Sequence, residues 1–318
     1  MEVCLKNPLF ALAFAALALA PLPALAAPLK VVASFSVIGD FAAEVGGDRI
    51  DLTTLVGPNG DIHVYEPKPA DAVSMSKADV ILVNGLALEG FLDRLVAASD
   101  TKAPVVELTK GITPIAGTEE DADHDDEAGS QNEHDEAGHH HHGAYDPHAW
   151  QSAANAEIYV KNIEAAFCTA DPDGCPVYTA NAEAYLGKLT ALDGEIHAMF
   201  DAVPAGNRVV ITSHDAFGYF GREYGLSFLA PQGISTDAEP SAAGVAALIQ
   251  QIRSEHAAAL FTENVTDPRV VEQISRETGI SIGGELYALL SGPDGPAATY
   301  LGMERYNAKT IATAILGK

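Results

Sequence analysis

Histidine is the residue type that carries most of the potential chemistry in this chain. Six of the eleven histidines lie within residues 119–143, which also hold ten acidic residues and neither Lys nor Arg. Imidazoles and carboxylates on a flexible segment hold a divalent cation only loosely, because each contact must offset the entropy of ordering the chain. These six are predicted to be auxiliary metal contacts: His124, His134, His139, His140, His141 and His142.

Three other histidines stand in a different sequence context. His63 lies in a Gly- and Pro-containing loop after a predicted strand, His148 follows an Asp-Pro turn, and His214 directly follows another predicted strand. In open α/β sheets, ligands bind at the carboxyl ends of strands. One such histidine alone is more often a hydrogen-bonded loop residue, but three together predict a metal site. His197 and His256 are interpreted as ordinary surface or boundary residues.

Two stretches of alternating strands and helices must position these histidines. Short β-branched runs alternate with amphipathic stretches from Leu29 to about Pro114, and the same pattern resumes at Arg208, which predicts parallel sheets covered by helices. Strands are expected over residues 31–35, 52–55, 80–83, 105–108, 208–212, 226–229, 258–262 and 280–283. Helices are expected over residues 37–45, 69–76, 88–97 and 297–316.

A long apolar stripe lies between the two alternating stretches. From Tyr178 to Val203 apolar residues recur at steps of four and three, which predicts one straight helix about 40 Å long. The predicted fold class is therefore α/β, with two parallel-sheet lobes linked by one long rigid helix and the metal site between the lobes. The expected organisation is an N-terminal lobe at 27–150 that includes a mobile acidic loop at 117–143, a helical linker at 151–204 and a C-terminal lobe at 205–318.

The first 26 residues resemble a secretory signal peptide. Lys6 supplies a positive start, residues 9–20 are apolar, and Ala24-Leu25-Ala26 fits a small-residue cleavage site. We expect cleavage before Ala27 and a periplasmic product. No later segment approaches the roughly 18 apolar residues of a membrane-spanning helix, so no intrinsic membrane span is predicted.

Net charge and cysteine content restrict the partners and the compartment. A net charge of −26 argues against binding to nucleic acid or to anionic lipid.

Cys168 and Cys175 flank an Asp-Pro-Asp-Gly turn, and export implies an oxidising compartment, so we expect a disulfide between them. A zinc–thiolate pair is the alternative, but it lacks a second cysteine pair.

The segments around the three isolated histidines carry a family resemblance. In this order they resemble the metal-binding solute-binding proteins of bacterial ABC transporters, the periplasmic zinc and manganese receptors. The resemblance covers essentially the whole exported chain and implies that His63 and His148 come from the first lobe and His214 from the second. It extends to Glu66-Pro67, to Phe261-Thr262-Glu263 and to the segment from Gly295 to Tyr300.

The donor set indicates which metal to expect. Three neutral imidazoles suit zinc, whereas manganese prefers more carboxylate oxygen, and family members resembling manganese receptors commonly carry Glu where this chain has His214. The family usually supplies an Asp two residues after a Leu-Tyr pair, but no carboxylate follows Leu286-Tyr287 at that place. Water, Glu285 or Asp294 remain the alternatives for a fourth ligand, since zinc accepts three protein ligands and one open position.

The resemblance implies a monomeric receptor that captures Zn²⁺ and delivers it to the permease of an ABC transporter. A second periplasmic zinc-carrying protein is a further candidate partner. The rival class is a secreted zinc hydrolase or hydratase that uses a metal-bound water, and an adhesin of the same fold would have the same metal site. No HExxH pair or catalytic dyad is present, and ligands from two lobes favour capture and release, so we predict that the chain is not an enzyme.

Overall fold

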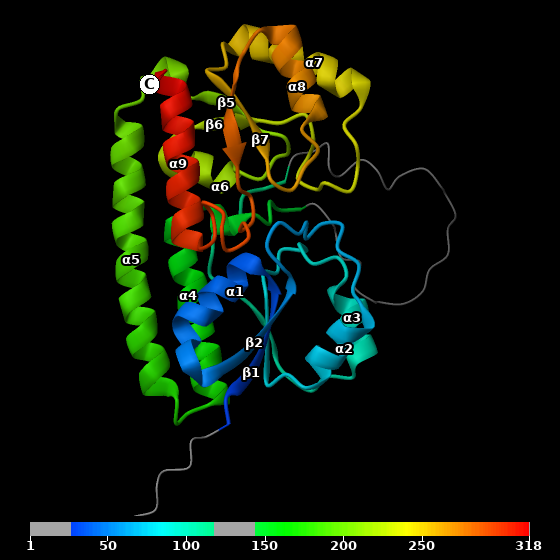
Figure 1. Ribbon diagram of the computed structural model, residues 1–318, viewed down its shortest axis with the longest axis vertical. Coiled ribbons are helices and arrows are strands. Elements are labelled where there is room, and N and C mark those ends of the chain that lie inside the picture. The colour runs from blue at the N-terminus through cyan, green and yellow to red at the C-terminus, as the bar shows by residue number, and fades with distance from the viewer. Residues whose placement is uncertain (1–26, 118–143, 318) are drawn as a thin grey trace, which may run out of the picture.

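A computed structural model describes residues 27–117 and 144–317. The predicted signal peptide and the six auxiliary histidines lie outside these residues. The architecture has two lobes, each built on a four-stranded sheet covered by helices, with long helices along one side (Figure 1). The predicted α/β fold class is confirmed.

The N-terminal lobe contains a parallel sheet of order β2-β1-β3-β4. All four residues of β3 are buried, as expected for a strand covered by helices on both faces. The strands are β1 (Leu29–Phe35), β2 (Ile50–Val56), β3 (Val80–Val83) and β4 (Val105–Glu107), and the helices are α1 (Ser36–Gly46), α2 (Pro69–Ser76) and α3 (Leu92–Ser99). The short 3-10 helix η1 (Gly47–Arg49) leads into β2.

The C-terminal lobe repeats this plan with the parallel order β6-β5-β7-β8. Its last helix begins at Tyr300 rather than at residue 297, because the Thr299 side chain accepts a hydrogen bond from the backbone N–H of Gly302 and caps the helix there. The elements are η4 (Ala205–Asn207), β5 (Val209–Ile211), α6 (Gly218–Tyr224), β6 (Ser227–Leu229), α7 (Ala242–Glu255), β7 (Ala259–Glu263), α8 (Arg269–Thr278), β8 (Ile282–Leu286) and α9 (Tyr300–Leu316).

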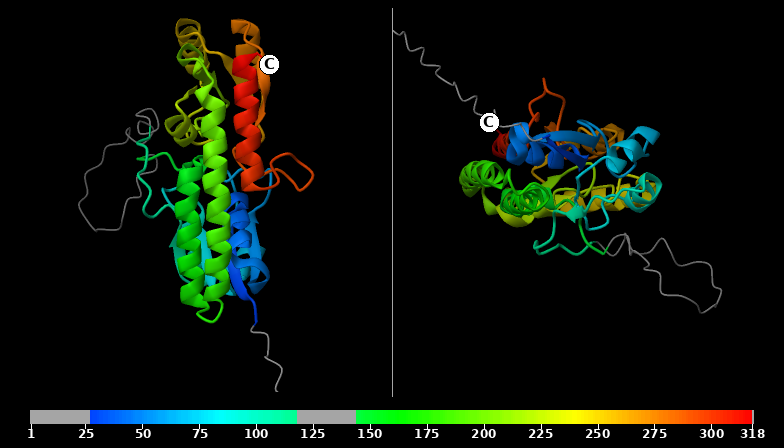
Figure 2. Two further views of the ribbon diagram at one scale, coloured as in Figure 1. Left: turned by 90° about the vertical axis from the view of Figure 1, so that its left-hand side faces the viewer. Right: turned by 90° about the horizontal axis from the view of Figure 1, so that it is seen from below.

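Two antiparallel helices connect the lobes. The 3-10 helix η3 (Ala149–Gln151) leads into α4 (Ala153–Ala170), which is followed by α5 (Cys175–Asp201), and Figure 2 shows α5 running alongside both lobes. A disulfide joins Cys168 to Cys175 across the turn between the helices. The predicted stripe is buried along α5 from Tyr178 to Ile196, but at the end of the helix Phe200 is buried while Met199 is only half-buried, and Val203 lies after the helix.

The main hydrophobic core extends through both lobes as one cluster, which includes residues of β1, α5, β7 and α9. Trp150 lies within it, with its ring centroid 4.8 Å from that of Phe35. The hydroxyl of Tyr300 donates to the Trp150 carbonyl over 2.7 Å. A smaller cluster lies beneath α7 and α8. The lobes are therefore packed against each other and against the linker helices.

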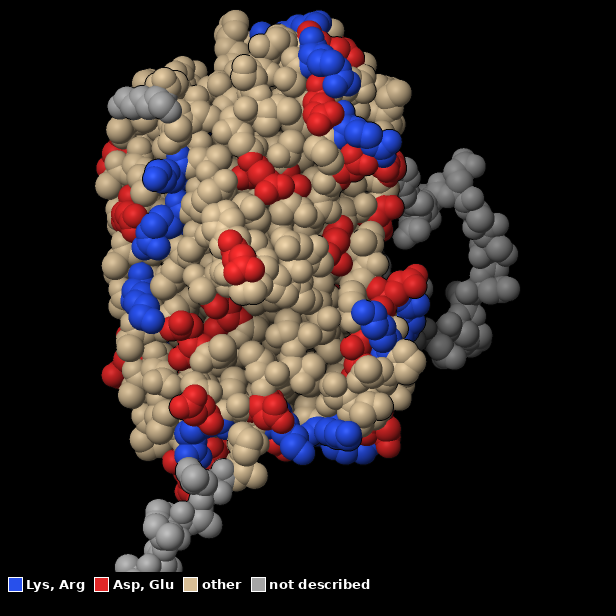
Figure 3. Space-filling view, in the orientation of Figure 1, with Lys and Arg blue, Asp and Glu red and all other residues tan. Residues whose placement is uncertain are grey.

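The surface of the described residues carries charges of both signs. On the face drawn in Figure 3, acidic side chains occur across the middle, whereas Lys and Arg lie mostly towards the edges. None of the helices within residues 27–117 and 144–317 is both long and apolar enough to cross a bilayer.

Candidate metal centre

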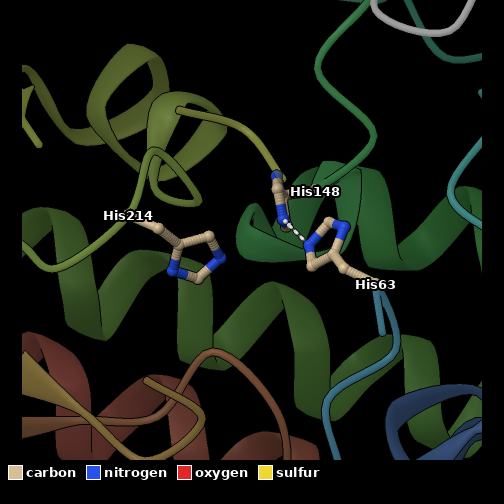
Figure 4. A group of neighbouring side chains, drawn as sticks. All are labelled: His63, His148 and His214. Carbon is tan, nitrogen blue, oxygen red and sulfur yellow. Dashed lines mark hydrogen bonds between the residues drawn. The ribbon is translucent and has the colours of Figure 1, made fainter. Parts of the chain in front are cut away.

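Three histidines from separate parts of the chain converge between the lobes (Figure 4). His63 lies in the loop after β2, His148 immediately precedes η3, and His214 follows β5. Their candidate ligand atoms all lie within 4.8 Å of one another. The Nε2 atoms of His63 and His148 are 3.1 Å apart, and the three ring centroids are separated by 5.2 to 5.9 Å. The structure thus brings together the three histidines predicted as ligands.

A buried carboxylate orients the His148 ring. Asp146 Oδ1 accepts the backbone N–H of His148 over 2.9 Å and lies 2.8 Å from its ring Nδ1. This contact places the ring proton on Nδ1, so that Nε2 presents its lone pair to the other histidines. Burial, and then the neighbouring His214, holds the pKa of His148 well below its usual value. The ring is therefore neutral and ready to donate to a metal at neutral pH.

Glu263, at the end of β7, lies beside His214 as Asp146 lies beside His148. Its Oε1 accepts the backbone N–H groups of Ser213 and His214 over 2.7 and 2.9 Å, and its Oε2 is 2.5 Å from the ring Nδ1 of His214. Burial alone would lower the pKa of His214, but the adjacent Glu263 carboxylate outweighs burial and raises it. With Nδ1 of His214 beside Glu263, the other ring nitrogen faces His63 and His148 (Figure 4). The sequence indicated Glu263 only as part of the Phe261-Thr262-Glu263 motif, although an acid at the end of a buried strand is typical of such a role.

Asp61 links the His63 loop to the other lobe. Its Oδ1 accepts the backbone N–H of His63 over 2.9 Å, while its Oδ2 accepts the hydroxyl of Thr236, after β6, over 2.6 Å. Burial, followed by the neighbouring His148 and His214, holds the pKa of His63 well below its usual value. Each candidate ligand is thus paired with one carboxylate, and one of these carboxylates bridges the lobes.

The segment after His148 is attached to the loop that follows β8. The side chains of Trp150 and Gln151 both donate to the Ala288 carbonyl, over 2.9 and 3.2 Å. The next residue, Leu289, is buried. This loop, which lacks the Asp that the resemblance implies, supplies a backbone oxygen that holds the His148 segment in place.

Neither carboxylate considered as a fourth ligand lies among the three histidines. Glu285 and Asp294 line a separate hollow of about 370 Å³ together with Asn59 and Asn264. Within the described part of the chain, the group containing His63 consists of three imidazoles and no carboxylate. Donor atoms around tetrahedral zinc lie about 3.3–3.4 Å apart at Zn–N distances of about 2.0–2.1 Å. The 3.1 Å between His63 and His148 is close to that spacing.

Comparison with known proteins places this chain in a family. The family model described as zinc-uptake complex component A, periplasmic, matches residues 31–314. The chain belongs to this family. It is a metal-binding substrate-binding protein of an ABC transporter and not an enzyme, which confirms the predicted class and removes the hydrolase alternative.

Individual relatives carry different metals in their names. The chain is similar to the iron-binding protein YfeA of Yersinia pestis, with 33% identity over 89% of this chain and 85% of the relative. It is also similar to the manganese-binding lipoprotein MntA of Halalkalibacterium halodurans, with 31% identity over 90% of this chain and 88% of the relative. These relatives share the family of this chain but bear names with different metals, so they do not identify the metal that it binds.

Solved structures share the fold over almost their whole length. A manganese-bound periplasmic metal binding protein from Candidatus Liberibacter asiaticus superposes with a TM-score of 0.76 at 30% identity, covering 90% of this chain and 99% of that one. The periplasmic zinc binding protein TroA from Treponema pallidum superposes with a TM-score of 0.77 at 27% identity, covering 91% and 99%.

Proposed function

We propose that this protein is a zinc receptor, which captures Zn²⁺ in the periplasm and delivers it to the permease of an ABC transporter. The observation that carries the choice of metal is the donor group of three imidazoles from His63, His148 and His214 without a carboxylate. Imidazole donors suit zinc, whereas manganese prefers carboxylate and water oxygens. Water completes a tetrahedral site, as zinc commonly accepts.

The proposed capture begins at the two histidines of the N-terminal lobe. His148 carries its proton on Nδ1, so His63 donates its Nε2 proton to His148 Nε2 in the metal-free protein. For zinc to bind at Nε2 of His63, this proton moves by way of solvent to Nδ1 of the same ring, which keeps the imidazole neutral and frees Nε2 as a ligand. His214 then completes the protein ligands from the other lobe. Release to the permease reverses this order as His214 separates from the pair.

The test of this function is a metal titration of His148→Ala. Loss of one of three imidazoles should weaken zinc binding at least tenfold, because water is a poorer donor than the oriented ring. Isothermal calorimetry with Zn²⁺ and Mn²⁺ measures both affinities. The control is His256→Asn, which removes an exposed imidazole from the end of α7 and keeps a residue type that tolerates its φ of 54°. Equal zinc affinity in His148→Ala and wild type, or tighter binding of Mn²⁺ than Zn²⁺, would refute the proposal.

The acidic histidine-rich segment is proposed to assist acquisition without supplying a primary ligand. The backbone on its two sides is already joined, since the Gly117 N–H donates to the Ala144 carbonyl over 3.1 Å and Ala116 pairs with Tyr145. Deleting residues 119–142 should therefore leave the tight site intact. We expect the deletion to remove weaker zinc binding and to slow uptake from chelated zinc. Loss of the tight site in calorimetry would show that the segment supplies a ligand.

A further inference from the structure

A second group of potential metal ligands lies on the helices of the C-terminal half. Asp193 and His197 are one turn apart on α5, and Glu223 lies on α6. The His197 Nε2 is 3.7 Å from Asp193 Oδ2 and 3.8 Å from Glu223 Oε1. All three candidate ligand atoms lie within 4.8 Å of one another. The position of His197 beside the apolar stripe of α5 indicated an ordinary surface or boundary residue, and Glu223 is too remote in sequence for the group to be recognised from the sequence.

Hydroxyl groups hold the two carboxylates so that one oxygen of each remains available. The hydroxyl of Tyr224 donates to Asp193 Oδ1 over 3.0 Å, and the hydroxyl of Ser152 donates to Glu223 Oε2 over 3.3 Å. The Tyr224 ring also packs edge-on against His197, with 5.0 Å between centroids. The oxygens that face His197 are the ones these hydroxyls do not engage. This orientation by outer partners is typical of metal ligands.

The spacing fits a shared cation better than direct ion pairs. A charge-assisted hydrogen bond joins nitrogen and oxygen at about 2.7–2.9 Å, whereas donors around one small divalent ion lie about 3.3–3.4 Å apart. The observed distances of 3.7 and 3.8 Å are nearer the second value. The ligand oxygens of Asp193 and Glu223 lie within 4.8 Å of each other, so the two negative charges repel. Within residues 27–117 and 144–317, His197 is the sole basic side chain that forms an ion pair with either of them.

We propose that Asp193, His197 and Glu223 form a second divalent-cation site, weaker than the first and completed by water. One imidazole and two carboxylates suit zinc and also manganese. The side chains are 28 to 44% exposed, so solvent reaches the ion and its affinity is modest. A bound ion would join α5 to α6 and, through Ser152, to the start of α4, four residues after His148. This site is independent of which metal the primary site carries.

The test uses the chain without residues 119–142 and with His63, His148 and His214 all replaced by Ala, so that the acidic segment and all three ligands of the primary site are removed. Calorimetry with zinc should reveal one weak equivalent. Adding His197→Ala should weaken that equivalent at least tenfold, and adding Glu223→Gln should weaken it severalfold, whereas adding His256→Asn should leave it unchanged. Circular dichroism and thermal unfolding verify that every variant folds. The proposal is overturned if the weak zinc binding is absent, or if its affinity is the same in the variants with His197→Ala and with His256→Asn.

Anomalous diffraction locates the ion in the full chain. Crystals grown with zinc chloride should show an anomalous peak at the zinc edge among Asp193, His197 and Glu223, in addition to any peak at His63. The absence of that peak in a crystal that carries zinc at His63 overturns the second site and leaves the zinc-receptor function intact. Conversely, a second-site peak without one at His63 would contradict the receptor function alone.

Discussion

At the scale of single residues, each of the three imidazoles of the candidate metal centre is oriented or held by a different carboxylate. Asp146 fixes the tautomer of His148, the Glu263 carboxylate lies beside Nδ1 of His214, and Asp61 holds the backbone of His63. A carboxylate behind a ligand histidine orients the ring and raises its basicity, and its loss typically lowers metal affinity 10- to 100-fold. The affinity of the centre thus depends on residues that do not touch the metal.

Replacing Asp146 with Asn should lower zinc affinity about tenfold. The amide keeps the volume of the buried side chain, but it removes the negative charge that favours the proton on Nδ1 of His148. Calorimetry at pH 7 measures the change. Asp51→Asn, at an exposed position on β2 of the same lobe, should leave affinity unchanged. Equal affinity in both variants would contradict the proposed role of Asp146.

The three histidines could be predicted from the sequence because each occurs in a recognisable local pattern, next to a strand end or an Asp-Pro turn. Their partners could not be predicted in the same way. Thr236 reaches Asp61 from 175 positions further along the chain, and such a contact depends on how the lobes pack. The same limit applies to Glu285, which is near the missing family Asp in sequence but lines a different hollow.

At the scale of elements, periodicity predicted α5 well because a helix buried along one face requires the same spacing throughout. It predicted the start of α3 less well. The helix expected from residue 88 begins at Leu92, and the turn before it contains Leu86 and Ala87 with positive φ values. The Glu89 carboxylate also accepts the backbone N–H of Asn84 over 2.6 Å and of Gly85 over 3.3 Å, which stabilises a loop there.

Gly187 in α5 is a position at which a substitution should stabilise the helix. Its position is exposed, and an added Cβ would meet no other atom within 4 Å. Gly187→Ala should therefore raise the free energy of unfolding by about 0.5–1 kcal/mol. Urea denaturation with EDTA present measures this change. As the matched control, Gly225→Ala should be destabilising, because Gly225 has a φ of +74° and its Cβ would approach Arg208 to 2.8 Å. A destabilised Gly187→Ala would contradict the prediction.

At the scale of the whole molecule, one buried acid makes stability depend on pH. Glu304 on α9 is fully buried, and neither of its carboxylate oxygens has a hydrogen-bond partner. Burial raises the pKa of Glu304 from 4.5 to about 8. The folded chain therefore keeps a proton that the unfolded chain releases between these values, so stability falls as pH rises from about 4.5 through 8.

Glu304→Gln should remove this part of the pH dependence, since the amide does not ionise. Each unit of pKa difference corresponds to about 1.4 kcal/mol, so between pH 5 and pH 8.5 the wild type should lose a few kcal/mol more stability than the variant, in which the other buried acids still titrate. Thermal unfolding in EDTA at both pH values measures the difference. Parallel losses in the two proteins would show that Glu304 does not titrate as its burial requires.

The continuous core has a consequence for how the transporter recognises its receptor. Because buried side chains of both lobes and of α5 form one cluster, wide opening would expose apolar surface at a cost of about 25 cal/mol per Å². We therefore expect metal-free and metal-loaded copies to have nearly the same outline. Empty copies would then compete with loaded copies for the permease, and the rate of uptake would depend on the fraction of receptors that are loaded as well as on their number.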